Sequence, residues 1–172
     1  MNSDQLYNHL EAMFGTTRCK YDVLPAEFLN SVNFKSHFNM FYIFNNQTSK
    51  FGGQHWLALC KKDNRIEFFD SYGLGLRFYG KHFVNFKKKY VVHENNKKLQ
   101  SIYSNVCGQF CLFYLYYRHK GYTMHEIEKM FTSDSVRNDK IVKQFVFRKK
   151  CTCLDSKCFI QICENQCETI NM

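Results

Sequence analysis

The sequence predicts an α+β fold, in which a cluster of β-strands is preceded and followed by helices. Apolar residues recur at helical spacing over 4–14, apolar runs typical of strands follow at 38–44, 55–60 and 65–70, and helical spacing returns from residue 76. Strands and helices therefore form separate blocks rather than alternating, which favours α+β over a parallel α/β arrangement.

The first half of the chain contains the expected strands. A helix over 4–14 can be capped by Asn2 or Ser3, and Pro25 suits the first turn of a short helix over 26–32. After the strand at 38–44, the polar stretch 61–64 separates two strand-like runs, which predicts a β-hairpin.

The second half is expected to be mainly helical. A helix over 76–90 carries an aromatic face, on which Tyr79, Phe83, Phe86 and Tyr90 are spaced four, three and four apart. The other expected elements are a strand at 99–103, an apolar helix over 107–120 that ends before Gly121, a helix from the capping box Thr123–Glu126 to Phe131, and a helix over 137–149.

Length and composition describe one globular domain with an appendage. The chain has 172 residues, of which 45% are hydrophobic and 23% charged, so it can bury a core of its own. We expect one folded domain over 1–150 and a cysteine-rich tail over 151–172. No apolar run approaches the ~20 residues of a membrane span and no secretory signal is visible, so we expect an intracellular protein with no membrane partner.

The nine cysteines divide between these two regions. Five lie in the tail: Cys151, Cys153, Cys158, Cys163 and Cys167. They could bind zinc, form disulfides or remain free. The paired CxxC motifs of a zinc site are missing, so we assign no metal ligands.

His55 and Asp70 form the first candidate pair. His55 enters an apolar strand beside Trp56, the only tryptophan, and Asp70 closes the next strand of the hairpin. Taken alone, each has a structural alternative: a packed strand histidine, and an aspartate that bonds the turn amides. Together, the carboxylate would fix the imidazole tautomer and stabilise the imidazolium.

Cys107 is the candidate nucleophile. It lies where a loop becomes an apolar helix, whose positive end would lower the thiol pKa, and Gly108 allows a close backbone approach. The alternative is a buried structural thiol, and that interpretation is adopted for Cys111, one turn further along.

In the order His55, Asp70, Gln100, Cys107, these residues resemble the adenovirus endopeptidase (adenain) family of cysteine proteases. The likeness is closer to the versions carried by Maverick/Polinton elements and adintovirus-like viruses, and more distant to proteases specific for SUMO and ubiquitin-like modifiers. The matching stretches are Gly-Gln-His-Trp at 53–56, Phe-Phe-Asp-Ser-Tyr-Gly at 68–73, Gln100, and Cys-Gly-Gln-Phe-Cys at 107–111.

The resemblance implies a papain-like or adenain-like fold, with a small central mixed sheet flanked by helices. It also implies roles: His55 as general base, Asp70 as its orienting group, and Cys107 as nucleophile. Gln100 would complete the oxyanion hole, with Trp56 and Gly108 framing the site. The tail cysteines have no counterpart in the family.

The implied function is cleavage of viral or mobile-element precursor proteins during virion maturation, by a monomer in the host nucleus or the virion. No cofactor is required for the chemistry, although DNA or an activating peptide could stimulate it. Two alternatives stay open: a deubiquitinase-like or deSUMOylase-like protease acting on host conjugates, and a non-enzymatic basic DNA-binding structural protein.

The net charge of +9 favours polyanions as partners. Lysines cluster near the end of the expected helix 76–90, at Lys87, Lys88 and Lys89, and basic residues recur over 140–150. These clusters are either a solvated surface or a track for non-specific DNA binding through phosphates.

Overall fold

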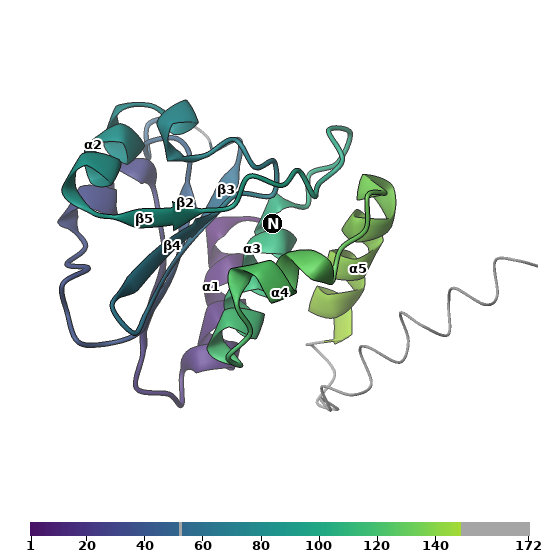
Figure 1. The fold of residues 1–172 in the computed structure, drawn as a ribbon, viewed down its shortest axis with the longest axis horizontal. Coiled ribbons are helices and arrows are strands. Elements are labelled where there is room, and N and C mark those ends of the chain that lie inside the picture. The colour runs from purple at the N-terminus through teal and green to yellow at the C-terminus, as the bar shows by residue number, and fades with distance from the viewer. Residues whose placement is uncertain (52, 149–172) are drawn as a thin grey trace, which may run out of the picture.

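The computed structural model describes residues 1–51 and 53–148, and they form a five-stranded mixed sheet between two layers of helices (Figure 1). The strands are β1 (Lys20–Leu24), β2 (Met40–Asn45), β3 (Trp56–Lys62), β4 (Arg65–Phe69) and β5 (Val92–Glu94), and they lie in this order across the sheet. The α-helices are α1 (Ser3–Phe14), α2 (Lys81–Lys89), α3 (Cys107–His119), α4 (Met124–Lys129) and α5 (Ser135–Arg148). Two 3₁₀ helices, η1 (Ala26–Ser31) and η2 (Leu76–Tyr79), complete the described elements. The α+β prediction is confirmed.

The sheet is antiparallel at its centre and parallel at its edges. β3 pairs antiparallel with β2 and β4, whereas β1 and β5 pair parallel with their neighbours. The predicted hairpin is β3–β4, and its two-residue turn holds Asp63 and Asn64 at φ 50° and 64°. Two positive φ angles are typical of the tight turns that match the twist of antiparallel strands.

Alternation along the central strands gives the protein two cores. Phe41 and Ile43 of β2, with Ala58 and Cys60 of β3, pack beneath α1, α3, α4 and α5. The intervening residues of both strands pack on the other face, against η1, η2 and α2. α3 is buried along most of its length in the first core, and its first residue is Cys107.

Two local predictions were wrong, and two strands were not predicted. Residues 99–103 form no strand, the helix expected over 76–90 is divided, and β1 and β5 were missed. The division occurs at Gly80, whose φ of 84° no helix tolerates, so η2 ends and α2 begins there. The short helix expected after Pro25 is present as the 3₁₀ helix η1.

The predicted capping box at Thr123–Glu126, one of the two expected caps of the first helix and the long apolar helix are present. Asn2 caps α1, Thr123 and Glu126 cap α4, and α3 ends just before Gly121, which has a φ of 103°. Among the described residues, no helix has the length and apolarity needed to cross a membrane. The predicted tail over 151–172 lies outside the described residues.

Candidate active site

His55 is the last residue before β3, and Asn46 fixes its backbone. The N–H of His55 donates to Asn46 Oδ1 at 3.0 Å, and the N–H of Asn46 donates back to the His55 carbonyl at 2.9 Å. The N–H of Gln54 also reaches Asn46 Oδ1, at 3.3 Å. These bonds tie the start of the β2–β3 loop to the backbone of the histidine at its end. Asn46 belongs to no recognisable sequence motif, so sequence reasoning did not identify it.

Asp70 follows β4, and the Asn95 side chain continues the sheet beside it. Asn95 Oδ1 accepts the Asp70 N–H and Asn95 Nδ2 donates to the Asp70 carbonyl, both at 2.8 Å. The amide thus occupies the place of a neighbouring strand, one residue beyond the β4–β5 pairing that ends at Phe68 and Glu94. This pairing holds the backbone of Asp70 in a fixed position.

The Asp70 carboxylate is fully buried and accepts four hydrogen bonds. His55 Nε2 donates to Oδ1 at 2.8 Å, as does the N–H of Tyr72 at 2.9 Å. The N–H of Leu74 and the Tyr79 hydroxyl donate to Oδ2, at 2.9 and 2.6 Å. Burial alone would raise the pKa of Asp70, but the bonds from His55, Tyr79 and Tyr72 outweigh it and hold the pKa below its usual value.

Cys107 begins α3 and faces the His55 ring. Since Nε2 of His55 is bound to Asp70, the other ring nitrogen, Nδ1, is the one available to the thiol. Burial would raise the pKa of Cys107, but the hydrogen bond and charge of His55, with the N–H groups of Trp56 and Gly108, lower it. The first N–H groups of a helix have no intrahelical partner and favour negative charge.

The same contacts favour the protonated form of His55. Burial would lower the pKa of this imidazole, but its bonds to Asp70 and Cys107 and their charges raise the pKa to about 9. A lowered thiol pKa beside a raised imidazole pKa favours a thiolate–imidazolium pair. This pair is the activated form of a cysteine nucleophile.

Two tyrosines that sequence reasoning missed stack on the imidazole. The Tyr72 ring lies 4.8 Å from the His55 ring, centroid to centroid, at 24°, and the Tyr79 ring lies at 5.7 Å and 19°. Tyr79 comes from η2, and it also donates the hydroxyl bond to Asp70. The orientation of His55 is therefore set by rings as well as by the carboxylate.

Trp56 and Gly108 pack against each other beside the thiol. A Cβ atom at position 108 would lie 3.3 Å from Cδ1 of Trp56 and 3.1 Å from Cδ2 of Leu6. The Trp56 indole N–H donates to the Met1 carbonyl at 3.1 Å. Glycine therefore lets α3 pack closely beneath the tryptophan, in addition to any contact with a substrate.

Gln100 has both ends of its side-chain amide held by serines. Oε1 accepts the Ser71 hydroxyl at 2.6 Å, and Nε2 donates to the Ser104 carbonyl at 3.0 Å and to its hydroxyl oxygen at 3.2 Å. Ser71 directly follows Asp70, so Gln100 is tied to the carboxylate's loop. The structure thus brings His55, Asp70 and Cys107 together, and turns the Gln100 amide nitrogen towards Ser104.

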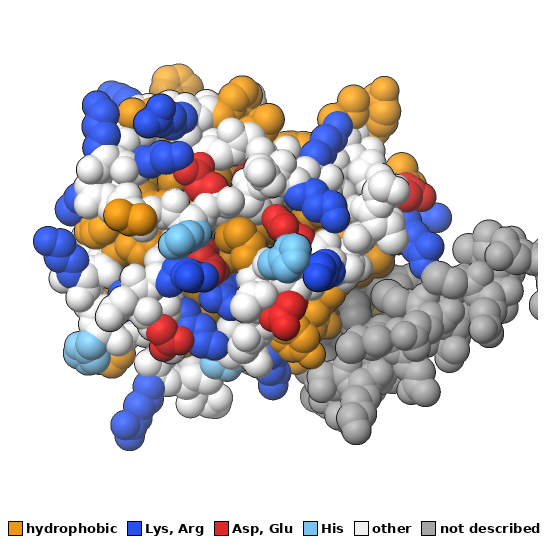
Figure 2. Space-filling view, in the orientation of Figure 1, with side chains coloured by type: hydrophobic (Ala, Val, Ile, Leu, Met, Phe, Trp, Pro, Cys, Tyr) orange, Lys and Arg blue, Asp and Glu red, His pale blue; other side chains and the backbone are white. Residues whose placement is uncertain are grey.

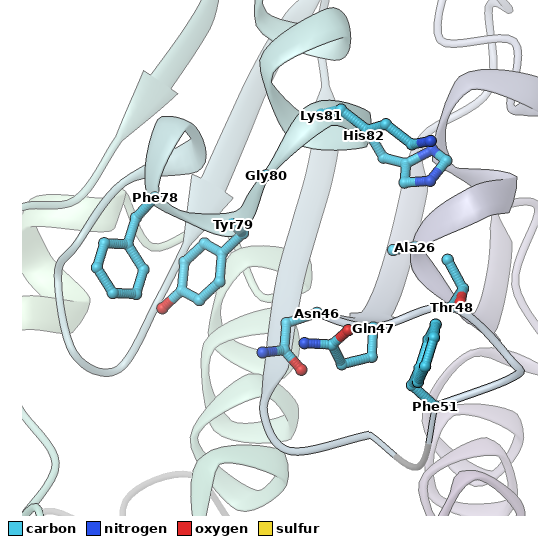
Figure 3. Close-up of a pocket in the computed structure, with 10 residues that line it drawn as sticks. All are labelled: Ala26, Asn46, Gln47, Thr48, Phe51, Phe78, Tyr79, Gly80, Lys81 and His82. Carbon is cyan, nitrogen blue, oxygen red and sulfur yellow. The ribbon is translucent and has the colours of Figure 1, made fainter.

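A groove of about 660 Å³ opens beside the stacked tyrosine (Figure 3). One wall is the segment from Phe78 to His82, and the other is the loop from Asn46 to Phe51, with Ala26 between them. Tyr79, whose hydroxyl donates to Asp70, is one of the residues that line this groove.

The remaining predicted features lie elsewhere. Lys87, Lys88 and Lys89 end α2, on the opposite face of the sheet from α3, and Figure 2 shows basic side chains gathered over this helix. The Lys87 ammonium forms an ion pair with Glu94. Cys111 is completely buried, which raises its thiol pKa well above the usual value. In the described part of the chain, no cluster of His, Cys, Asp or Glu could hold a metal ion.

Comparison with known proteins assigns no family: no protein-family model and no curated protein matches the chain.

Proposed function

We propose that this protein is a cysteine endopeptidase with Cys107 as nucleophile, His55 as general base and acid, and Asp70 as the group that orients His55. One observation supports this most strongly. A single buried imidazole bonds a carboxylate through Nε2, and the Cys107 thiol, whose interaction with the same imidazole raises the imidazole pKa, lies at the N-terminus of the central helix.

In the proposed reaction, the Cys107 thiolate attacks the carbonyl carbon of a peptide bond. The oxyanion faces unpaired N–H groups at the start of α3, which can stabilise it. The His55 imidazolium then donates its proton to the leaving amine, and the C–N bond breaks to leave a thioester. Water attacks the thioester while His55 accepts its proton, and the carboxylic acid and the thiolate are released.

Gln100 is proposed as a second oxyanion donor. The role requires one N–H of its amide to leave Ser104 when a substrate binds. The short bond from Ser71 to Oε1 keeps the amide oriented during this exchange.

The proposed fold relationship is adenain-like, within the papain-like group, and rests on the motif order and on the central helix that carries the cysteine. We accordingly propose viral or mobile-element precursor proteins as substrates, with the host nucleus or the virion as the place of action. Profiling capsid precursors against conjugates of ubiquitin-like modifiers tests the alternative of a deconjugating protease.

Thiol labelling combined with peptide cleavage tests the proposal directly. Iodoacetamide should label Cys107 first, with an apparent midpoint below the ~8.5 of an ordinary thiol, because the pKa of Cys107 is lowered. Peptide cleavage should decline as pH rises through about 9, since His55 there loses the proton that the leaving amine needs.

Cys107→Ala should abolish both labelling and cleavage, and Cys111→Ala is the matched control, a thiol one turn along the same helix. Undiminished cleavage by Cys107→Ala would overturn the proposed enzyme.

A further inference from the structure

We infer that Asn138 and Asp139, two neighbouring residues of α5, position Gln100 by binding the peptide groups on both sides of it. The inference rests on the proposed function, in which the Gln100 amide stabilises the oxyanion. It adds two positioning residues from a helix that carries none of the candidate catalytic residues. This helix lies beside the loop that leads into α3 (Figure 1).

Asn138 binds the residue before Gln100. It is completely buried, and its Nδ2 donates to the Leu99 carbonyl at 3.0 Å and to the Thr132 carbonyl at 2.9 Å. Since Oδ1 accepts the Thr132 N–H at 2.9 Å, the two ends of the amide cannot be exchanged. The Asn138 side chain therefore has one orientation, which fixes the Leu99 carbonyl relative to α5.

Asp139 binds the residue after Gln100. It is also buried, and its Oδ1 accepts the Ser101 N–H at 3.3 Å. The Ser101 carbonyl in turn accepts the Ser104 N–H at 3.2 Å and the Ser104 hydroxyl at 3.1 Å. Ser104 is the residue that accepts from Gln100 Nε2, so α5 also fixes the group from which this amide must turn away.

The loop after Asp70 binds Gln100 from the other side. The Ser71 carbonyl accepts the N–H groups of Leu99 at 2.8 Å and of Gln100 at 3.0 Å, and the Ser71 hydroxyl donates to Gln100 Oε1. Of the Gln100 side chain, the Nε2 end alone has to change partner. A donor whose position is set beforehand needs little reorganisation when negative charge develops on the oxyanion.

Loss of an α5 contact should therefore weaken transition-state stabilisation rather than substrate binding. Asp139→Leu keeps the size of the side chain and removes the acceptor, so kcat should fall about tenfold with KM little changed, because the oxyanion forms only in the transition state. Asp139→Asn retains an oxygen at the same position and should lose no more than about threefold in kcat.

A double-mutant cycle on kcat separates positioning from a general structural role. Gln100→Met keeps the size of the side chain and removes the amide, so kcat should fall by about 10²-fold. If Asp139 acts through Gln100, adding Asp139→Leu to Gln100→Met should lower kcat by less than about twofold more. Asp139→Ala removes the same acceptor without adding apolar bulk and completes the cycle if the Leu variant does not fold.

Thr132→Val is the matched control for the contacts of α5. It removes the hydroxyl that lies 3.3 Å from Asn138 Oδ1, and it leaves the bonds to Leu99 and Ser101 in place. Its kcat should change by less than about twofold.

Two thiol reagents give the same test without turnover. A peptide aldehyde adds to the Cys107 thiolate, a C–S bond forms and the carbonyl electron pair moves to an oxygen that occupies the oxyanion hole. Iodoacetamide is attacked at a saturated carbon, iodide leaves, and no oxyanion forms. Asp139→Leu should therefore bind the aldehyde about tenfold more weakly, in proportion to its loss of kcat, and iodoacetamide should label Cys107 at an unchanged rate.

The outcomes distinguish the positioning role from the proposed function. Losses of kcat that multiply in the double variant, or an equal loss in iodoacetamide labelling, would overturn the positioning role and leave the protease intact. Full kcat in Gln100→Met would overturn the oxyanion role of Gln100 and the positioning role with it. Labelled Cys107 with no cleavage of any peptide or precursor protein would overturn the proposed function itself.

Discussion

The orientation of the His55 imidazole depends on a tyrosine that reaches it by two routes. The Tyr79 ring stacks on the imidazole at 5.7 Å, and its hydroxyl donates to Asp70 at 2.6 Å. Burial and the neighbouring Asp70 charge both raise the pKa of Tyr79, so the phenol stays protonated and acts only as a donor towards Asp70. We therefore assign Tyr79 as a positioning residue.

Replacing Tyr79 by Phe should lower kcat/KM about tenfold, because the buried carboxylate loses one charge-assisted hydrogen bond and the stacking is retained. The pKa of Asp70 should rise towards its usual value, so the acid limb of the pH profile should move to higher pH. Full pH–rate profiles measure both effects.

Tyr72→Phe is the control for this variant, since Tyr72 also stacks on His55 but only its backbone N–H bonds Asp70. An unchanged pH profile in Tyr79→Phe would show that Tyr79 only packs.

Sequence reasoning could find His55, Asp70 and Cys107 but not their supporting residues, for a physical reason. The three carry chemistry recognisable from residue type and order. Tyr79 was expected on the core face of a helix over 76–90, because its spacing to Phe83 is helical. The positive φ of Gly80 breaks that helix and turns Tyr79 towards Asp70 instead. Asn46 and Asn95 act through contacts made only when distant segments meet.

At the scale of elements, one buried ion pair joins the strand before Asp70 to the helix that carries Cys107. Arg118 of α3 bonds Glu67 of β4 through Nε at 2.5 Å and through the second guanidinium nitrogen at 3.1 Å. The Tyr114 hydroxyl also donates to Glu67, at 2.7 Å. Both charged side chains are buried, so the relative placement of β4 and α3 depends on this pairing.

Glu67→Ala should therefore destabilise the protein by about 3–5 kcal/mol, because it leaves Arg118 buried without its partner. Denaturant titration measures the loss. Glu94→Gln is the comparison, since its pair with Lys87 is partly exposed and such pairs contribute about 0–1 kcal/mol. Similar losses in the two variants would contradict the anchoring role of Glu67.

The elements that sequence reasoning missed are short or irregular. β1 and β5 are the two edge strands of the sheet, and β5 has only three residues. None of their residues is fully buried, so neither strand shows the alternation of buried and exposed positions that predicts a strand. Residues 99–103 have a strand-like composition, but the Leu99 and Gln100 N–H groups both donate to the Ser71 carbonyl, which makes a loop of them. Hydrogen bonds to residues distant in the sequence determine the conformation of these segments.

For the whole molecule, the net charge of +9 supports the proposal of non-specific DNA binding, and the structure refines which lysines would take part. Lys88 and Lys89 are exposed, whereas Lys87 is paired with Glu94. In the second basic cluster, Lys149 and Lys150 lie outside the described residues.

With ~5 phosphate contacts, the slope of log K against log salt should be about −4 to −5 for duplex DNA of any sequence. Replacing Lys88 and Lys89 by Gln should flatten it by about two, and Lys87→Gln by less than one. Glu94→Gln should steepen it, because it frees Lys87. Salt-dependent binding assays measure these slopes, and a slope near zero in the unmodified protein would exclude a DNA track.

The Asn95 side chain that continues the sheet has a consequence for amide hydrogen exchange. Loop amides commonly exchange fast, but Asp70, Tyr72, Gly73 and Leu74 each donate to a protein acceptor: the Asn95 side chain or an oxygen of Asp70 itself. These four amides should therefore exchange nearly as slowly as the interior of β3, and Asn95→Ala should accelerate Asp70 most. Exchange at the rate of an unstructured chain would contradict this rigidity. A loop that opens only with global unfolding is ordered once, during folding, so in the proposed enzyme the Asp70 carboxylate needs no reordering in each turnover.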